Sequence, residues 1–259
     1  MSVCAPVLTY DNTKTSSSTR IVHRIRECRE SRDRLASAVA VPSVRSAAPL
    51  CHPCVVVVQA VAFDIGGVLE RVAPPDRWLG KWQERLGLAA AEFQAALAGV
   101  DPGDVIKTGG LSEAQYRQRY AAVLGLSDAQ VEEFIADMWD WYCGELDHEL
   151  TRYAASLRPR FATAIVSNSA DGARREEQTR YGFAGLFGTI IYSHEVGLAK
   201  PDQRIYALLC NQLGVPPDEV VFVDDVQENV DAAIEFGIHG VLHRSTTESI
   251  GVIDSLIAT

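Results

Sequence analysis

Four short polar segments of this chain could do chemistry, because each follows an apolar run that predicts a strand. Asp64 comes directly after the β-branched run that ends at Phe63, and two glycines follow it closely. The other segments lie further along the chain: Ser167-Asn168, Lys200, and Asp224-Asp225. Since parallel strands carry their ligands at their carboxyl ends, we expect these segments to meet at one edge of a sheet.

Together these side chains would suit the transfer of a phosphoryl group. Mg²⁺ prefers a few carboxylates, waters and a substrate phosphate, so Asp64, Asp224 and Asp225 are predicted to hold it. Ser167 and Lys200 would offer a donor and a positive charge to phosphate oxygens. A carboxylate can attack phosphorus and form an acyl phosphate that water then hydrolyses, and a metal ion offsets the repulsion between the two anions.

The elements that must position these segments alternate along the chain. Apolar runs predict strands at about 55–63, 162–166, 189–192, 219–223 and 240–242. Helical patterns lie between and after the later strands, at about 172–181, 202–213, 229–236 and 246–257. This alternation predicts an α/β fold, in which helices cover both faces of a parallel sheet to give a three-layer α/β/α core.

A long helical stretch separates the first two predicted strands. Its apolar side chains recur at helical spacing, and Ser112 and Ser127 are expected to cap two of its helices. We therefore predict a core of residues 55–73 and 158–259, interrupted by an all-helical cap domain of residues 74–157. The cap is expected to lie over the edge that carries the polar segments.

Composition and charge narrow the classes of function. The chain has 259 residues and a formal net charge of −10, and its acidic body, residues 55–259, is a poor binder of nucleic acid. Membrane-spanning helices are not expected, because the chain has no apolar stretch of about 18 residues or more. Only Cys143 and Cys210, of six cysteines, lie in the body, so we expect no disulfide framework and a cytoplasmic location.

Residues 1–54 differ from the rest of the chain. They carry eight Lys/Arg against four Asp/Glu and show little sustained periodicity, so a disordered N-terminal extension is predicted. A targeting segment is the alternative, although its acidic residues count against that interpretation. The pair Cys51 and Cys54 has the spacing of a metal or redox motif, but it lacks a second ligand pair and is a weak signal.

From residue 57 to 258 the chain resembles the haloacid dehalogenase superfamily of hydrolases, which has a Rossmann-like core. The resemblance rests on four motifs, residues 63–69, 166–168, 197–201 and 222–229. It implies that Asp64 is the nucleophile and a metal ligand, that Ser167, Asn168 and Lys200 bind the phosphoryl group, that Asp225 and less directly Asp224 hold Mg²⁺, and that Asn229 supports them. The helical insert matches the superfamily's cap, which selects substrates.

One position departs from the pattern of most phosphatases in the superfamily. They have a second Asp two residues after the nucleophile, which protonates the leaving group, whereas this chain has Gly66. The backbone carbonyl of Gly66 could still bind the metal. The glucose-1-phosphate phosphatase and epoxide-hydrolase N-terminal phosphatase branch looks similar here, and its anomeric phosphates leave more easily. Alternatively, Glu70, Asp104 or His194 takes over the proton transfer.

Three hypotheses for function follow. The first is a Mg²⁺-dependent phosphatase that acts on a small phosphorylated metabolite, such as a sugar phosphate. The second is a metal-independent 2-haloacid dehalogenase, in which Asp64 attacks carbon. The Asp224-Asp225 pair favours the phosphatase, because a metal-free site for an anionic halo acid gains nothing from two more carboxylates. The third is a non-catalytic binding protein of the same fold. The sequence leaves the oligomeric state open.

Overall fold

The computed structural model describes residues 57–101 and 105–258. The predicted N-terminal extension, its cysteine pair and Asp104 lie outside these residues. The strands are β1 (Ala60–Phe63), β2 (Glu70–Arg71), β3 (Glu145–Leu146), β4 (Ala162–Ser167), β5 (Thr189–Tyr192), β6 (Val220–Asp224) and β7 (His239–Leu242). The α-helices are α1 (Asp76–Leu86), α2 (Ala90–Ala98), α3 (Glu113–Leu124), α4 (Asp128–Cys143), α5 (His148–Leu157), α6 (Ala173–Tyr181), α7 (Phe183–Leu186), α8 (Ser193–Val196), α9 (Gln203–Leu213), α10 (Gln227–Phe236) and α11 (Thr246–Ile257). The 3₁₀-helices are η1 (Ile106–Thr108) and η2 (Pro217–Glu219).

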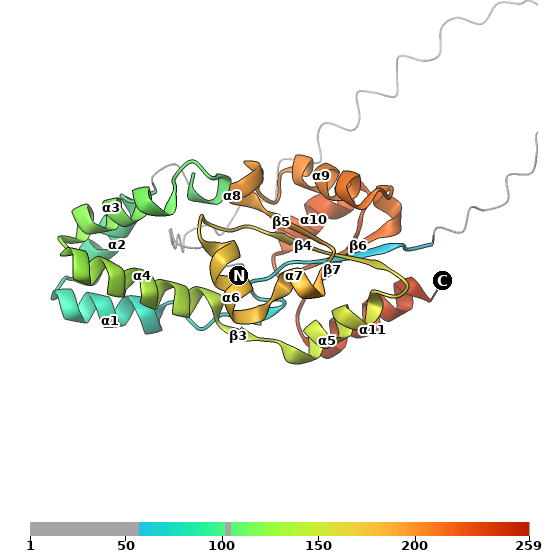
Figure 1. Cartoon of the computed structure of the whole chain (residues 1–259), viewed down its shortest axis with the longest axis horizontal. Helices are drawn as coiled ribbons and strands as arrows, with labels where there is room; N and C mark the ends of the chain where they lie inside the picture. The colour runs from blue at the N-terminus through green and yellow to red at the C-terminus, as the bar shows by residue number, and fades with distance from the viewer. Residues whose placement is uncertain (1–56, 102–104, 259) are drawn as a thin grey trace, which may run out of the picture. The chain divides into compact units, whose positions relative to one another are not determined.

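Five strands form one parallel sheet in the order β5-β4-β1-β6-β7 (Figure 1). The central strand β1 pairs on both sides, with Phe63 opposite Ile165 of β4 and opposite Val223 of β6. Both neighbours therefore end beside Asp64. This register confirms the predicted parallel sheet and places three of the four polar segments at the carboxyl edge of adjacent strands.

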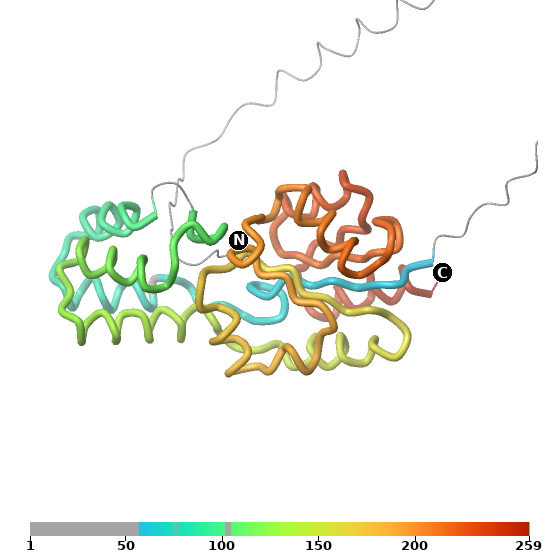
Figure 2. Tube along the Cα trace, turned by 45° about the horizontal axis from the view of Figure 1, so that its top comes forward, coloured from blue at the N-terminus to red at the C-terminus, as the bar shows by residue number. Residues whose placement is uncertain are grey.

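Alternate residues of β1 face opposite sides of the sheet. Ala60 and Ala62 pack in a buried cluster with residues of α9 and α10, while Val61 and Phe63 belong to a second cluster that includes residues of α5 and α11. Figure 2 shows β1, in blue, running between these two pairs of helices. Helices on both faces confirm the predicted three-layer core, and the all-apolar sequence of β1 follows from burial on both sides.

The helical insert contains α1 to α4, which pack on one another through α1–α4, α2–α3 and α3–α4 contacts. Their aromatic side chains form its interior, with Trp78 stacked on Trp141 and Phe134 against both Trp82 and Tyr120. Ser112 caps α3, accepting a hydrogen bond from the backbone N–H of Gln115, as expected. The insert is therefore helical.

Two features of the insert were not predicted. Strands β2 and β3 pair antiparallel at its base, and they are too short for alternating polarity to reveal them. Helix α5 packs against α11 and β4, although the predicted cap extends to residue 157. The division into a core of 55–73 and 158–259 and a cap of 74–157 stays a prediction.

The boundaries of the expected core strands and helices agree with the structure to within two residues, except at the first strand. Residues 57–59 are not part of β1, because β4 and β6 both begin opposite Ala60. Among the described residues, no helix is long and apolar enough to cross a membrane. Cys143 and Cys210 are buried free thiols, and the cytoplasmic location stays a prediction.

Candidate active site

Lys200 joins two of the predicted carboxylates at the edge of the sheet. Its Nζ lies 2.7 Å from Oδ1 of Asp64 and 2.7 Å from Oδ2 of Asp224. All three side chains are almost completely buried. Because a buried charge is costly unless it is paired, one ammonium group shared by two carboxylates fixes the positions of all three.

Asp224 is held by further hydrogen bonds from its own loop and helix. The backbone N–H of Val226 donates to its Oδ1 at 2.8 Å, and Nδ2 of Asn229 lies 3.1 Å from both carboxylate oxygens. Asn229 is near the start of α10, which folds back over the end of β6. Its placement supports the predicted role of Asn229 in orienting this end of the site.

Asn168 positions the main chain of Lys200. Its Oδ1 accepts a hydrogen bond from the Lys200 N–H at 2.8 Å, and its Nδ2 donates to the Lys200 carbonyl at 2.9 Å. Both polar atoms of Asn168 are thus used on the protein, which favours a positioning role over the predicted contact with substrate. Ser167, the buried last residue of β4, lies directly before it.

Burial and the neighbouring charges both shift the pKa values of Asp64 and Lys200. Burial raises the pKa of Asp64 to about 7, although Lys200 lowers it, and Asp224 adds to the rise. For Lys200, burial lowers the pKa, but the charges of Asp224 and Asp64 outweigh burial and raise it above its ordinary value. Lys200 therefore keeps its proton, and its single charge does not fully compensate the carboxylates around it.

The arrangement of the carboxylates fits a divalent cation. Asp64, Asp224 and Asp225 each offer one oxygen, and these oxygens lie within 4.8 Å of one another. When all three carboxylates are ionised, Lys200 offsets one negative charge and leaves two, which one Mg²⁺ would neutralise. Hard oxygen donors in this number also match the preference of Mg²⁺ for carboxylates combined with waters and substrate oxygens.

The two adjacent glycines that follow Asp64 and Ile65 differ in whether their positions have room for a side chain. Gly67 has φ +77°, and a Cβ there would lie 2.4 Å from Oδ2 of Asp225, so only glycine fits beside that carboxylate. A Cβ at Gly66 would meet nothing within 4 Å, and its φ is outside the left-handed region. The position of the expected second Asp therefore has room for a side chain.

The sequence offers Glu70, Asp104 and His194 as proton donors in place of an acid at Gly66, and their surroundings differ. Glu70, in β2, is only 1% exposed, and burial raises its pKa well above its ordinary value. His194, in α8, has Nδ1 2.8 Å from Oγ of Ser169, and burial lowers its pKa. Asp104 lies outside the described residues. The burial of Glu70 counts against its reaching a leaving group to donate a proton.

A second buried acid, Glu177 of α6, was not predicted. It is fully buried and accepts a hydrogen bond from the hydroxyl of Tyr192. Burial raises the pKa of Glu177 to about 8, and burial together with the charge of Glu177 raises the pKa of Glu70 well above its ordinary value. The signal in the sequence is weak, because only the four-residue spacing from buried Ala173 marks this face of a highly charged helix.

A hydrogen bond and an ion pair join the helical insert to the core beside the site. The backbone N–H of Glu113 in α3 donates to Oδ2 of Asp171 at 2.8 Å, and its carboxylate pairs with Arg175 of α6 at 2.7 Å. Near η1, Gly109 has φ +75°, and a Cβ there would lie 2.2 Å from the carbonyl oxygen of His194. The insert therefore packs closely against the segments that follow β4 and β5, which include α6 and α8.

A parallel sheet with this carboxylate and lysine cluster at its carboxyl edge, and a helical insert after the first strand, defines a class of hydrolase. The family model of haloacid dehalogenase-like hydrolases matches residues 58–237. The chain belongs to this family, as its four motifs predicted.

The proteins that are similar to this chain in sequence include both epoxide hydrolases and phosphatases. Bifunctional epoxide hydrolase 2 of Sus scrofa is 27% identical over 216 residues, which cover 76% of this chain and 38% of that protein. N-acetylmuramic acid 6-phosphate phosphatase of Pseudomonas aeruginosa is 25% identical over 189 residues, which cover 69% of this chain and 78% of that protein. This chain spans between 22% and 38% of the length of the epoxide hydrolases that it matches.

A solved structure shows the same fold. A haloacid dehalogenase family enzyme from Bacteroides thetaiotaomicron, in complex with magnesium and inorganic phosphate, is 21% identical and gives a TM-score of 0.61. The alignment covers 72% of this chain and 94% of that one. At this identity the likeness establishes the fold and leaves the chemistry to be argued from the site.

Proposed function

We propose that this protein is a Mg²⁺-dependent phosphatase that hydrolyses a small phosphorylated metabolite, such as a sugar phosphate, through a phosphoaspartate on Asp64. The observation that carries this proposal is the cluster of buried Asp64 and Asp224, both paired with Lys200, and half-buried Asp225 beside them. The similarity to N-acetylmuramic acid 6-phosphate phosphatase supports it. The proposed location is the cytoplasm, on the basis of cysteine usage.

In this proposal each polar residue has a separate task. The carboxylate of Asp64 attacks phosphorus, while Lys200 and Ser167 bind the oxygens of the transferring group. Asn168 and Asp224 keep Lys200 in place through the backbone and side-chain bonds described above. Bound Mg²⁺, held by Asp64, Asp224, Asp225 and the carbonyl of Gly66, supplies charge neutralisation.

The proposal also predicts which substrates react readily. Without an acid at Gly66, the leaving oxygen departs with its negative charge unless the substrate or water supplies a proton. General acid catalysis contributes roughly 10²–10⁴ in rate. Esters with a stabilised leaving group, including anomeric sugar phosphates, should therefore be hydrolysed faster than simple alkyl phosphates.

The direct test is release of phosphate from p-nitrophenyl phosphate and from a panel of phosphorylated metabolites, with and without Mg²⁺. We expect activity that a chelator removes and that Asp64→Asn abolishes, while thermal unfolding shows that the variant is folded. Activity that survives chelation would contradict the metal's role. Release of chloride from 2-chloropropionate in the presence of EDTA would instead support a dehalogenase, and inactivity of folded protein towards both substrate classes would support a binding protein.

A further inference from the structure

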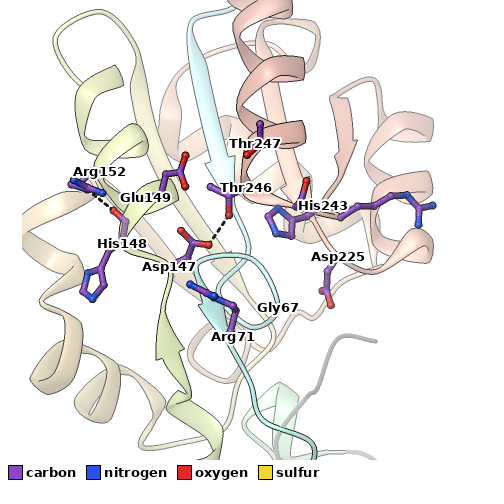
Figure 3. Close-up of a pocket in the computed structure, with 12 residues that line it drawn as sticks. Gly67, Arg71, Asp147, His148, Glu149, Arg152, Asp225, His243, Thr246 and Thr247 are labelled. Atoms are coloured by element: carbon purple, nitrogen blue, oxygen red, sulfur yellow. Dashed lines mark hydrogen bonds between the residues drawn. The ribbon is translucent and has the colours of Figure 1, made fainter.

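A cavity of about 920 Å³ adjoins the carboxylate cluster (Figure 3). Asp225 and Gly67 form the side that it shares with the cluster. Its other walls come from β2, the start of α5 and the loop between β7 and α11, none of which has a role in the proposed hydrolysis. A cavity of this size matches the usual volume of small-molecule sites.

Three arginines from three separate elements line the cavity. Arg71 belongs to β2, Arg152 to α5, and Arg244 to the loop before α11. Elements distant in sequence therefore bring positive charge to one cavity in an otherwise acidic chain. Guanidinium groups bind carboxylates and phosphates through paired hydrogen bonds, so such a wall favours an anionic ligand.

The acidic residues of the lining, Asp147, Glu149 and Asp225, offset this charge only in part once Asp225 is assigned to the metal. Asp147 uses both carboxylate oxygens within the protein, since Oδ1 accepts from the Leu150 N–H at 2.9 Å and Oδ2 accepts from the hydroxyl of Thr246 at 2.6 Å. Asp225 belongs to the carboxylate cluster that is proposed to hold Mg²⁺. With Asp225 assigned to the metal, Asp147 and Glu149 are the acids left in the lining, against three arginines.

Two helices also begin at this cavity. Helix α5 starts after Asp147 and α11 after Ser245, and the hydrogen bond from Thr246 to Asp147 ties the two starts together, as Figure 3 shows. Both helices have ten residues or more. The amino end of a helix carries partial positive charge, which adds to the attraction that the arginines exert on an anion.

We propose that this cavity binds a second anionic group of the substrate, a carboxylate or a second phosphate, carried on the leaving group. The inference rests on the proposed function, because a phosphoryl group at Asp64 is what places the rest of the ester beside Asp225. Asp64 and Asp225 offer oxygens within 4.8 Å of each other, and Asp225 lines the cavity, so the cavity begins within the length of a small metabolite from the attacking carboxylate. The substrates are therefore phosphate esters that bear another negative charge.

The test compares esters that differ only in the second anion. Inhibition constants against p-nitrophenyl phosphate are measured for 3-phosphoglycerate and glycerol 3-phosphate, and for fructose 1,6-bisphosphate and fructose 6-phosphate. We expect one pair to show a preference of roughly tenfold to a hundredfold for the more charged ester, as charge-assisted hydrogen bonds predict. The pair that shows it distinguishes a carboxylate from a second phosphate.

Arg71→Gln and Arg244→Gln should each remove most of that preference. Arg204→Gln is the matched control, because Arg204 is an exposed arginine of α9 that pairs with Asp202 away from the cavity lining, and it should leave the ratio unchanged. A ratio near one for both pairs in the unmodified protein overturns the proposal. A preference that both cavity variants retain also overturns it.

A failure of the proposed phosphatase function gives a different result from a failure of the cavity proposal. Folded protein that releases no phosphate from p-nitrophenyl phosphate contradicts the phosphatase. Calorimetric dissociation constants for the same four esters, measured with Mg²⁺, then decide the role of the cavity without any turnover. Tighter binding of the more charged ester, lost in Arg71→Gln and kept in Arg204→Gln, supports the cavity, and equal binding within both pairs refutes it.

Discussion

Introducing an acid at Gly66 tests whether its absence limits catalysis. The substitution Gly66→Asp should fit, because a Cβ there meets nothing within 4 Å and the backbone is outside the left-handed region. If the new carboxyl group protonates the leaving oxygen, the gain should approach the usual contribution of a general acid, roughly 10²–10⁴ in rate, or about 3–5 kcal/mol.

The assay is the dependence of kcat/KM on the pKa of the leaving group, because kcat/KM reports the steps up to formation of the phosphoaspartate. A series of aryl phosphates and one alkyl phosphate gives the slope. The unmodified protein should lose activity steeply as the leaving group becomes more basic. Gly66→Asp should flatten this slope and gain most on the alkyl ester.

Two matched variants separate acid catalysis from other effects of the substitution. Gly66→Asn adds a side chain of nearly the same shape that has no acidic proton, so its slope should match that of the unmodified protein. Gly67→Ala should remove activity, because its Cβ would lie 2.4 Å from Oδ2 of Asp225. Equal slopes for Gly66→Asp and Gly66→Asn would refute the reasoning.

Three further predictions concern stability and positioning. The pKa of Glu177 is about 8 in the folded protein against an ordinary 4.5. Its protonated form therefore stabilises the fold fully below pH 4.5, and this contribution is lost as the pH rises to about 8. Glu177→Gln removes this titration, so the free energy of unfolding should fall less steeply with rising pH than in the unmodified protein. Urea unfolding between pH 5 and 8 measures this, and equal slopes for both proteins would contradict it. Gly109→Ala, which adds a Cβ 2.2 Å from the His194 carbonyl oxygen, should lower the melting temperature more than Gly125→Ala, which has a similar φ but open space; equal losses would show that backbone strain alone matters. Asn168→Ala removes two hydrogen bonds to the Lys200 backbone and should lower kcat/KM by roughly ten- to a hundredfold, whereas unchanged steady-state kinetics would exclude the positioning role.

The sequence predicts the sheet and the location of the cluster because both depend on local patterns. Apolar runs of four to six residues mark β4, β5 and β6, and the polar residues at their ends follow from chain order alone. Parallel pairing then needs only the rule that carboxyl ends share an edge. Asp64 and Asp224 could thus be placed together without knowledge of any contact.

What the sequence does not predict depends on contacts between distant segments. Asn168 was expected to touch substrate, but its amide atoms bond to the backbone of Lys200, a residue 32 positions away. Glu177 lies in a helix whose composition is typical of an exposed surface, and its burial follows from packing near Tyr192 of the next strand. The cavity beside Asp225 likewise depends on two helix starts that only the folded chain brings together.

The same charges that suit the cluster to chemistry make it unfavourable for folding alone. Burial raises the pKa of Asp64 to about 7 from an ordinary 3.8, so the stability that its protonated form confers is lost as the pH rises through this range. Lys200 reduces this loss but cannot remove it, because Asp224 competes for the same ammonium group. A divalent cation would neutralise the remaining charge and return Asp64 to its ionised, nucleophilic form at neutral pH. In the proposed phosphatase, therefore, one cation both completes the fold of the site and activates the residue that attacks phosphorus.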